Sequence, residues 1–285
     1  MTDASTALRY TAFSDAPGGG NPAGIVLDAS NLADAEMQAI AAEIGFAETA
    51  FIIESSIDGD SRHVRVRYFS PLAEVPFCGH ATVATAVALA DRGGEGVFVF
   101  ETPVGPVTIT TAADGDTITA SFTSVEPSVE PLDDDVLETL LGLLSASMER
   151  LDPAFPPRVS FAGNRHPVIV FTDRDDFDSF TFDPDAMSDL MDVQGWTGTV
   201  TTILPTGAAE FDSRNLFPVG TITEDPATGS AAAAFGAYLR ALGLVDAPAD
   251  IEITQGSHVG RPSRLRVHIP VTGGIVVTGT ATPIA

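Results

Sequence analysis

The chain repeats itself, and this repeat constrains the fold more than any other feature of the sequence. Short segments of the first half reappear in the second half in the same order, although the spacing between them varies somewhat. The three pairs are residues 20–27 (GNPAGIVL) with 163–170 (GNRHPVIV), 67–71 (RYFSP) with 214–218 (RNLFP), and 103–106 (PVGP) with 258–262 (HVGRP). Three matches in one order indicate an internal duplication.

Strand-like runs and a few helices surround the repeated segments. Strands are predicted at 24–27, 49–53, 64–69, 97–100, 107–110, 118–122, 168–171, 199–204, 265–269 and 275–280. Helices are predicted at 34–44, from about residue 133, and at the small-residue segments 81–90 and 230–242. We therefore expect an α+β fold with two similar, pseudo-twofold-related domains, each a β shell around a central helix. The expected domains are 1–124 and 125–271, with the last strand, about 272–285, able to return to the first.

Acidic residues dominate the charge of the chain. The 285 residues include 39 Asp plus Glu and 14 basic residues, all of them Arg, which gives a net charge of −25. Such a surface repels nucleic acid and anionic membranes, so neither is expected as a partner. The apolar fraction of 44% excludes an acidic disordered chain. We interpret the acidity as adaptation to a salt-rich cytoplasm, where cations screen the repulsion between carboxylates.

The redox and targeting signals agree with that location. Cys78 is the single cysteine, so no intramolecular disulfide can form. Residues 1–4 (MTDA) contain no basic segment followed by an apolar stretch, so no signal peptide is expected. No run of eighteen apolar residues is present, so no membrane span is expected either. These observations predict a cytoplasmic protein.

Two helix starts occupy equivalent places in the repeat. Residues 78–82 (CGHAT) and 225–230 (DPATGS) each precede a helix of small residues. The first turn of a helix exposes unpaired N–H groups and the positive end of the helix dipole, which favours a carboxylate. Ordinary helix capping explains either segment alone. Their symmetric occurrence favours a shared role in binding an anionic substrate.

Several segments carry a family resemblance. The segments are 21–24 (NPAG), 47–51 (AETAF), 76–82 (PFCGHAT), 224–231 (EDPATGSA), 255–256 (QG) and 260–263 (GRPS). The chain resembles the PhzF-like (phenazine biosynthesis) family over nearly its whole length, and 225–230 is the most specific match. The resemblance implies a diaminopimelate-epimerase-like fold with a cleft between two similar domains, no cofactor, and a homodimer. It also implies a cofactor-independent isomerase or epimerase that moves a proton on a small carboxylate substrate.

The resemblance also assigns roles to individual residues. Glu48 takes the place of the catalytic glutamate, and it begins strand 49–53, where partial desolvation would favour the protonated carboxyl. From the pattern alone, an exposed glutamate at a strand entry is the simpler interpretation. His80, whose imidazole is expected to titrate near neutrality, could bind substrate or relay a proton, and Asp225 could orient a protonated group of the substrate. The residues expected to contact the substrate are Gly79, Gly229, Ser230, Asn21 and Cys78.

Cys78 leaves two interpretations open. Racemases with this fold use two cysteines as acid and base, but the second position here is Asp225, so that mechanism cannot operate. A helix start favours the thiolate, which leaves some acid/base role open. A buried and inert thiol is the simpler interpretation.

Two other classes of function remain as alternatives. A hydrolase could use Cys78 or Ser230 as nucleophile, but neither lies in a Gly-x-Ser-x-Gly segment. A non-catalytic binding protein could keep the fold, although the joint presence of Glu48, His80 and Asp225 disfavours it. The five histidines form no cluster with metal-ligand spacing, so no metal is expected. The absence of lysine excludes a Schiff-base cofactor.

Overall fold

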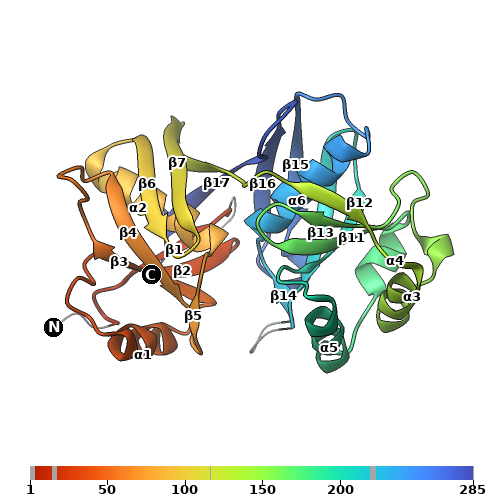
Figure 1. Ribbon diagram of the computed structural model, residues 1–285, viewed down its shortest axis with the longest axis horizontal. Coiled ribbons are helices and arrows are strands. Elements are labelled where there is room, and N and C mark those ends of the chain that lie inside the picture. Colours follow the sequence, from red (N-terminus) through yellow and green to blue (C-terminus); the bar gives the residue numbers. More distant parts are fainter. Residues whose placement is uncertain (1–3, 15–17, 116, 219–222, 285) are drawn as a thin grey trace. The chain divides into compact units, whose positions relative to one another are not determined.

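The computed structural model describes residues 4–14, 18–115, 117–218 and 223–284 (Figure 1). Residues 1–3, which entered the expectation about a signal peptide, lie outside the described residues. The chain forms two compact units. Unit 1 contains the described residues up to Thr123 and those from Thr278 onward, and unit 2 is Ser124–Val277.

Unit 1 is a closed ring of strands. Its strands are β1 (Leu8–Ala12), β2 (Asn21–Val26), β3 (Glu48–Glu54), β4 (His63–Phe69), β5 (Glu74–Val75), β6 (Gly96–Thr102), β7 (Gly105–Asp114), β8 (Thr117–Thr123) and β17 (Val276–Pro283). Pairing follows the order β1–β2–β3–β4–β6–β7–β8–β17 and returns to β1, and the short β5 pairs with β4. The pairs β2–β3 and β4–β6 are parallel. A closed ring leaves few unpaired strand edges.

Helix α2 (Gly79–Gly93) runs through this ring and contacts β1, β2, β3, β7 and β8. Every residue from 80 to 88 is buried, so the helix is enclosed on all sides. Alanine and valine occupy most of these positions, and such small side chains allow the strands to approach the helix closely. Helix α1 (Asp34–Ile44) packs on β3 and β4 and ends, as predicted, at Gly45, which has φ of 71°.

Unit 2 repeats the same order of elements. Its strands are β9 (Ser128–Pro131), β10 (Arg158–Phe161), β11 (Arg165–Val170), β12 (Val200–Pro205), β13 (Glu210–Leu216), β14 (Glu224–Asp225), β15 (Ala249–Gln255) and β16 (Ser263–Ile269). They pair in the order β9–β10–β11–β12–β13–β15–β16, with β14 on β13. The pairs β11–β12 and β13–β15 are parallel, like their counterparts in unit 1. Helix α6 (Gly229–Ala241) packs against β9, β10, β11 and β16.

Three helices add a second core to unit 2. They are α3 (Asp134–Leu143), α4 (Arg174–Ser179) and α5 (Pro184–Gln194), and two short 3₁₀ turns, η1 (Met148–Arg150) and η2 (Ser257–Val259), complete the unit. Leucines of α3 and methionines of α5 pack around Trp196 and Phe171. Both units are therefore strand-rich with a central helix, which confirms the predicted α+β class. Within the described residues, no helix is long and apolar enough to cross a membrane.

Candidate active site

The start of α2 is a rigid corner of unit 1. Cys78 is the N-cap residue and has an extended backbone, with φ of −141°. The hydroxyl of Thr82 donates to the Cys78 carbonyl at 2.8 Å, and the Thr82 amide donates to the same oxygen at 3.0 Å. The fully buried Tyr68 hydroxyl lies 2.6 Å from Thr82 Oγ1. Because the Thr82 hydroxyl hydrogen is used in the bond to Cys78, Tyr68 is the donor of that pair. These bonds fix the direction in which the residues of the first turn project.

Glu48, Cys78 and His80 meet at this corner. Glu48 Oε2 lies 3.5 Å from Cys78 Sγ and 3.4 Å from His80 Nε2. Cys78 Sγ lies 3.3 Å from His80 Nδ1. The Glu48 side chain is 17% exposed, whereas Cys78 and His80 are buried. A carboxyl group is thus placed beside a thiol and an imidazole in a largely dehydrated setting, which is an arrangement suited to proton transfer.

His80 is held by the start of β2. Its Nδ1 lies 3.2 Å from Asn21 Nδ2, and the imidazole also hydrogen-bonds to the backbone of Pro22. Burial lowers the pKa of His80 to about 4, against the smaller opposing effect of the Pro22 hydrogen bond. The expectation that this imidazole titrates near neutrality is therefore wrong. His80 is neutral at pH 7 and can donate or accept a hydrogen bond without carrying a charge.

The same three residues are potential metal ligands. One oxygen of Glu48, Cys78 Sγ and a ring nitrogen of His80 lie within 4.8 Å of one another. A carboxylate, a thiolate and an imidazole are ligand types that zinc accepts. The sequence reasoning considered only histidine clusters and missed this mixed group. Metal independence stays a prediction.

The corresponding corner of unit 2 is the turn that leads from β14 into α6. Thr228 is the N-cap of α6, and its hydroxyl donates to Asp225 Oδ2 at 2.6 Å. Gln255 clamps the turn: its Nε2 donates to the Asp225 carbonyl at 2.6 Å and to Thr228 Oγ1 at 3.0 Å, and its Oε1 accepts from the Thr228 amide at 3.2 Å. A Cβ on Gly256 would lie 2.5 Å from the Pro226 carbonyl oxygen, so only glycine allows this close approach.

Gly229 and Ser230 are the first two residues of α6. Their amides belong to the first turn and have no carbonyl acceptor within the helix. The Ser230 hydroxyl lies 3.1 Å from Nε2 of His166, a fully buried residue on β11. His166 was not among the predicted site residues, although it lies in the repeated segment 163–170. Alignment of the two repeats on Pro22 and Pro167 would have matched it with Asn21.

An arginine–glutamate pair supports each corner. In unit 1, Arg67 on β4 binds Glu74 on β5 at 2.7 Å through both nitrogens of its fork. In unit 2, Arg214 on β13 binds Glu224 on β14 at 3.2 and 2.5 Å. Arg67 and Arg214 are the first residues of the second repeated segment. The duplication therefore preserves not only the order of elements but also the ion pair that precedes each helix start.

The structure distributes the predicted residues between the two units. Asn21, Glu48, Cys78, Gly79 and His80 gather at the start of α2, and Asp225, Gly229 and Ser230 gather at the start of α6.

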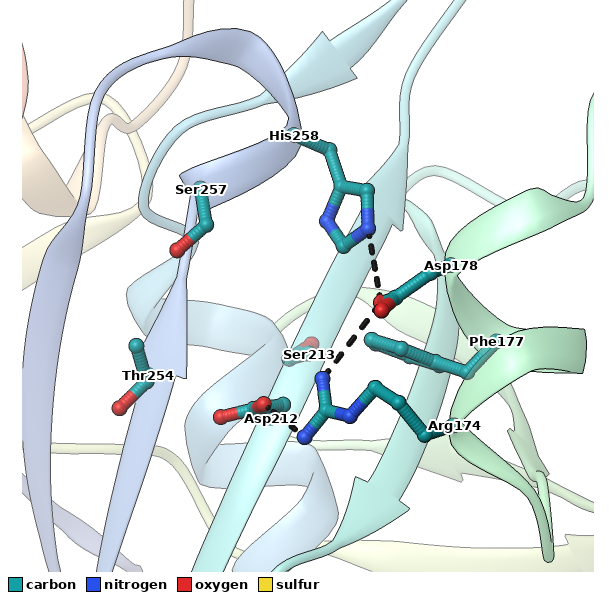
Figure 2. Close-up of a pocket in the computed structure, with 8 residues that line it drawn as sticks. All are labelled: Arg174, Phe177, Asp178, Asp212, Ser213, Thr254, Ser257 and His258. Atoms are coloured by element: carbon teal, nitrogen blue, oxygen red, sulfur yellow. Dashed lines mark hydrogen bonds and ion pairs between the residues drawn. The ribbon is translucent and has the colours of Figure 1, made fainter.

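A separate pocket of about 380 Å³ in unit 2 contains none of the predicted residues (Figure 2). Its charged groups pair with one another. Arg174 contacts Asp212 at 2.6 Å and Asp178 at 3.4 Å, and His258 contacts Asp178 at 3.1 Å. These pairs tie α4 to β13 and to the turn η2, so we assign them a structural role.

Comparison with known proteins identifies the family. The family model described as "Phenazine biosynthesis-like protein" (PhzC-PhzF) matches residues 10–285. The chain belongs to the phenazine biosynthesis-like family. It is similar to the "uncharacterized isomerase YddE" of Escherichia coli (strain K12), with 32% identity over 95% of this chain and 93% of that protein.

Two further relatives of the phenazine biosynthesis-like family extend the comparison. The chain is 30% identical to the trans-2,3-dihydro-3-hydroxyanthranilate isomerase of Pseudomonas fluorescens, over 88% of this chain and 86% of that protein. The crystal structure of a PhzF-family protein from Bacillus anthracis matches with a TM-score of 0.85 at 26% identity, covering 98% of this chain and 96% of the other. The protein is therefore an isomerase of the PhzF type with the diaminopimelate-epimerase-like fold, and its substrate is a small molecule.

Proposed function

We propose that this isomerase moves a proton on a small carboxylate-containing substrate, with Glu48 as the acid and base. The observation that carries the proposal is the position of the Glu48 carboxyl, 3.4 Å from His80 and 3.5 Å from Cys78 at the start of α2. Glu48 removes a proton from an activated carbon and returns it at the same or another position. The neutral His80 lies 3.4 Å from the carboxyl and brings no charge to it in either protonation state of Glu48.

The start of α6 supplies a binding site for a carboxylate in this proposal. The first-turn amides at Gly229 and Ser230 and the Ser230 hydroxyl would donate hydrogen bonds to this carboxylate and stabilise charge that develops during the reaction. Asp225, held by Thr228, orients a protonated group of the substrate. The internal repeat supports this division of labour, because it gives each unit the same strand, turn and helix start. The hydroxyanthranilate compound in the name of the Pseudomonas fluorescens relative is itself a carboxylate.

The test is uptake of solvent hydrogen. Small amino and hydroxy acids, together with trans-2,3-dihydro-3-hydroxyanthranilate, are incubated with the enzyme in deuterated water and analysed by mass spectrometry. The wild-type enzyme should introduce carbon-bound deuterium into its substrate. Because general acid–base catalysis contributes roughly 100- to 10,000-fold, Glu48→Gln should slow this exchange by at least about 100-fold.

Glu54→Gln is the matched control. Glu54 ends the same strand, and its 46% exposed side chain pairs with Arg65 at 3.1 Å. This variant should exchange deuterium at the wild-type rate. Exchange by Glu48→Gln at the wild-type rate would remove Glu48 from the mechanism. An acyl adduct of Cys78 or Ser230 with an electrophilic ester would instead support the hydrolase alternative, and binding of the acids without exchange would support a non-catalytic protein.

Two attributes implied by the family resemblance belong to the same proposal. We propose that the enzyme acts without a cofactor and forms a homodimer. Exchange that survives exhaustive dialysis against a chelator supports the first, and a molecular mass of about twice 29.6 kDa in sedimentation supports the second.

A further inference from the structure

His166 is fixed on three sides within unit 2. Its Nδ1 lies 3.0 Å from the Thr199 amide nitrogen, and its Nε2 lies 3.1 Å from Ser230 Oγ. The third contact is with Gly198, where a Cβ would lie 2.3 Å from the Cε1 atom of the imidazole. The backbone at Gly198 therefore packs directly on the ring. A side chain with no exposed surface and this little free space keeps one orientation.

The surroundings of Nδ1 select one tautomer of the imidazole. The Thr199 amide is a donor that cannot change its role, so Nδ1 must be the acceptor. The Thr199 hydroxyl donates its hydrogen to Asn215 Oδ1 at 2.6 Å, so it does not donate to Nδ1, and its oxygen, 3.1 Å from Nδ1, could accept a ring proton. The Thr199 carbonyl lies at 3.1 Å, and an under-satisfied carbonyl is tolerated more readily than a buried amide without an acceptor. The amide contact is the shortest of the three, at 3.0 Å, and a second hydrogen on Nδ1 would meet the amide hydrogen, so we place the ring proton on Nε2.

A proton on Nε2 determines what the Ser230 hydroxyl can do. The Nε2–H group donates to Ser230 Oγ, so the hydroxyl hydrogen cannot point at the imidazole and turns away from it. Ser230 is partly exposed, whereas His166 is buried behind it. We propose that His166 is a positioning residue that commits the Ser230 hydroxyl to donating a hydrogen bond toward the substrate carboxylate. This inference rests on the proposed function, in which the start of α6 binds that carboxylate.

The same tautomer argues against Ser230 as a nucleophile. A serine nucleophile needs a neighbouring base with a free lone pair, and Nε2 has none when it carries the proton. Burial also lowers the pKa of His166 to about 4, so the ring stays neutral at physiological pH. His166 thus acts as a fixed, uncharged donor.

The repeat places a related contact in unit 1. Asn21 and His166 each precede the proline near the start of their strand, and His80 and Ser230 are each the second residue of their helix. Asn21 contacts His80 at 3.2 Å, and His166 contacts Ser230 at 3.1 Å. A buried strand residue therefore orients the second helical side chain in both units.

The tautomer can be read on the free protein. Nitrogen-15 spectra of histidine-labelled enzyme report whether each ring nitrogen carries a proton, and the signals of His166 are identified by their loss in His166→Asn. We expect a protonated Nε2 and an unprotonated Nδ1 that do not change between pH 8 and pH 5.5. A proton on Nδ1, or titration within this range, would overturn the proposal. This result does not depend on the substrate, so a failure of the proposed function would leave it intact.

Two substitutions then separate positioning from structural support. The short amide of His166→Asn can replace Nδ1 as acceptor for Thr199 but cannot reach Ser230, whereas the longer amide of His166→Gln can replace the Nε2 donor. With the carboxylate for which the wild-type enzyme catalyses deuterium exchange, His166→Asn should raise KM roughly tenfold, because the Ser230 hydroxyl is no longer committed to its hydrogen bond with a charged group. His166→Gln should restore most of the affinity.

The Ser230→Ala background provides the control. Because His166 acts through the serine hydroxyl, His166→Asn should change KM less than about twofold in an enzyme that already lacks it. The same tenfold rise of KM in both backgrounds would show that His166 only supports the fold. The same conclusion would follow if, in both His166 variants, kcat fell and KM rose in proportion to the loss of thermal stability.

Discussion

The two arginine–glutamate pairs allow one stability prediction to be tested against an internal control. Arg214 is 6% exposed, and Glu224 beside it has an 11% exposed side chain. The guanidinium also donates to the carbonyls of Phe177 at 2.9 Å and Phe180 at 3.2 Å, and it lies 3.6 Å from the centre of the Phe180 ring. Arg214→Gln leaves the Glu224 carboxylate buried without its cation. Breaking a buried pair in this way costs about 3–5 kcal/mol.

Arg67 occupies the equivalent place in unit 1 and is the matched comparison. Its partners are more exposed, with side-chain exposures of 35% for Glu74 and 76% for Asp34. Ion pairs that water can reach contribute about 1 kcal/mol or less, and salt weakens them further. Arg67→Gln should therefore cost at most about 1 kcal/mol, although Arg67 makes three short hydrogen bonds to carboxylates.

Urea unfolding followed by tryptophan fluorescence measures the difference. Trp196 is the single tryptophan of the chain and is buried in the core of unit 2, so it reports on that unit, while circular dichroism reports on the whole chain. With an m-value of about 2 kcal/mol/M, a loss of about 4 kcal/mol moves the midpoint of the Arg214→Gln transition down by about 2 M. Equal midpoint shifts for the two variants would refute the reasoning from burial.

Buried polar groups elsewhere lead to two more predictions. Burial lowers the pKa of His80 and His166 from 6.5 to about 4. As the pH falls, these histidines therefore bind protons in the unfolded chain before they do so in the folded chain. The free energy of unfolding should drop by about 3 kcal/mol per histidine between pH 6.5 and 4. Urea midpoints should show a steeper drop for the wild type than for His166→Asn, and parallel curves would contradict this. Gln255→Met removes three hydrogen bonds, so it should lower the free energy of unfolding by about 3 kcal/mol and reduce the rate of deuterium exchange. Gln38→Met removes one hydrogen bond to a carbonyl, so it should lower the free energy of unfolding by about 1 kcal/mol and leave that rate unchanged. Equal losses in calorimetry would contradict the second prediction.

Helices α1, α2, α3 and α6 and most strands could be predicted because their patterns are local. The end of α1 at Gly45 and the N-cap of α3 at Asp133 agree with the sequence reasoning. Helix α5 was missed although Asp183 before Pro184 is a typical helix start. Strand β13 was missed for a different reason. Its residues 212–215 (DSRN) show no alternation of apolar and polar residues, and most of the hydrogen-bond partners of their side chains come from other segments of the chain.

Asn215 shows why such a strand is difficult to predict from sequence. Its Oδ1 accepts from the hydroxyls of Thr199, just before the neighbouring strand β12, and Thr201 on that strand, so this buried polar side chain has hydrogen-bond partners in the core. Two helix starts and a family resemblance marked the candidate residues in the sequence, and their roles stay predictions. The neutral state of His80 and the contact of His166 with Ser230 could not be predicted, because both depend on burial, which sequence does not give.

The last strand has a consequence for how the protein is made. β17 pairs with β1 and β8, so the ring of unit 1 cannot close until the C-terminal strand has been synthesised. About 150 residues, nearly all of unit 2, separate the end of β8 at Thr123 from the start of β17 at Val276. At roughly 5–20 residues per second, the ribosome needs about 8–30 s to produce them. During that interval the edges of β1 and β8 that later pair with β17 are open. We therefore expect a chaperone to bind nascent unit 1, and we expect truncated chains that lack β17 to aggregate through these edges.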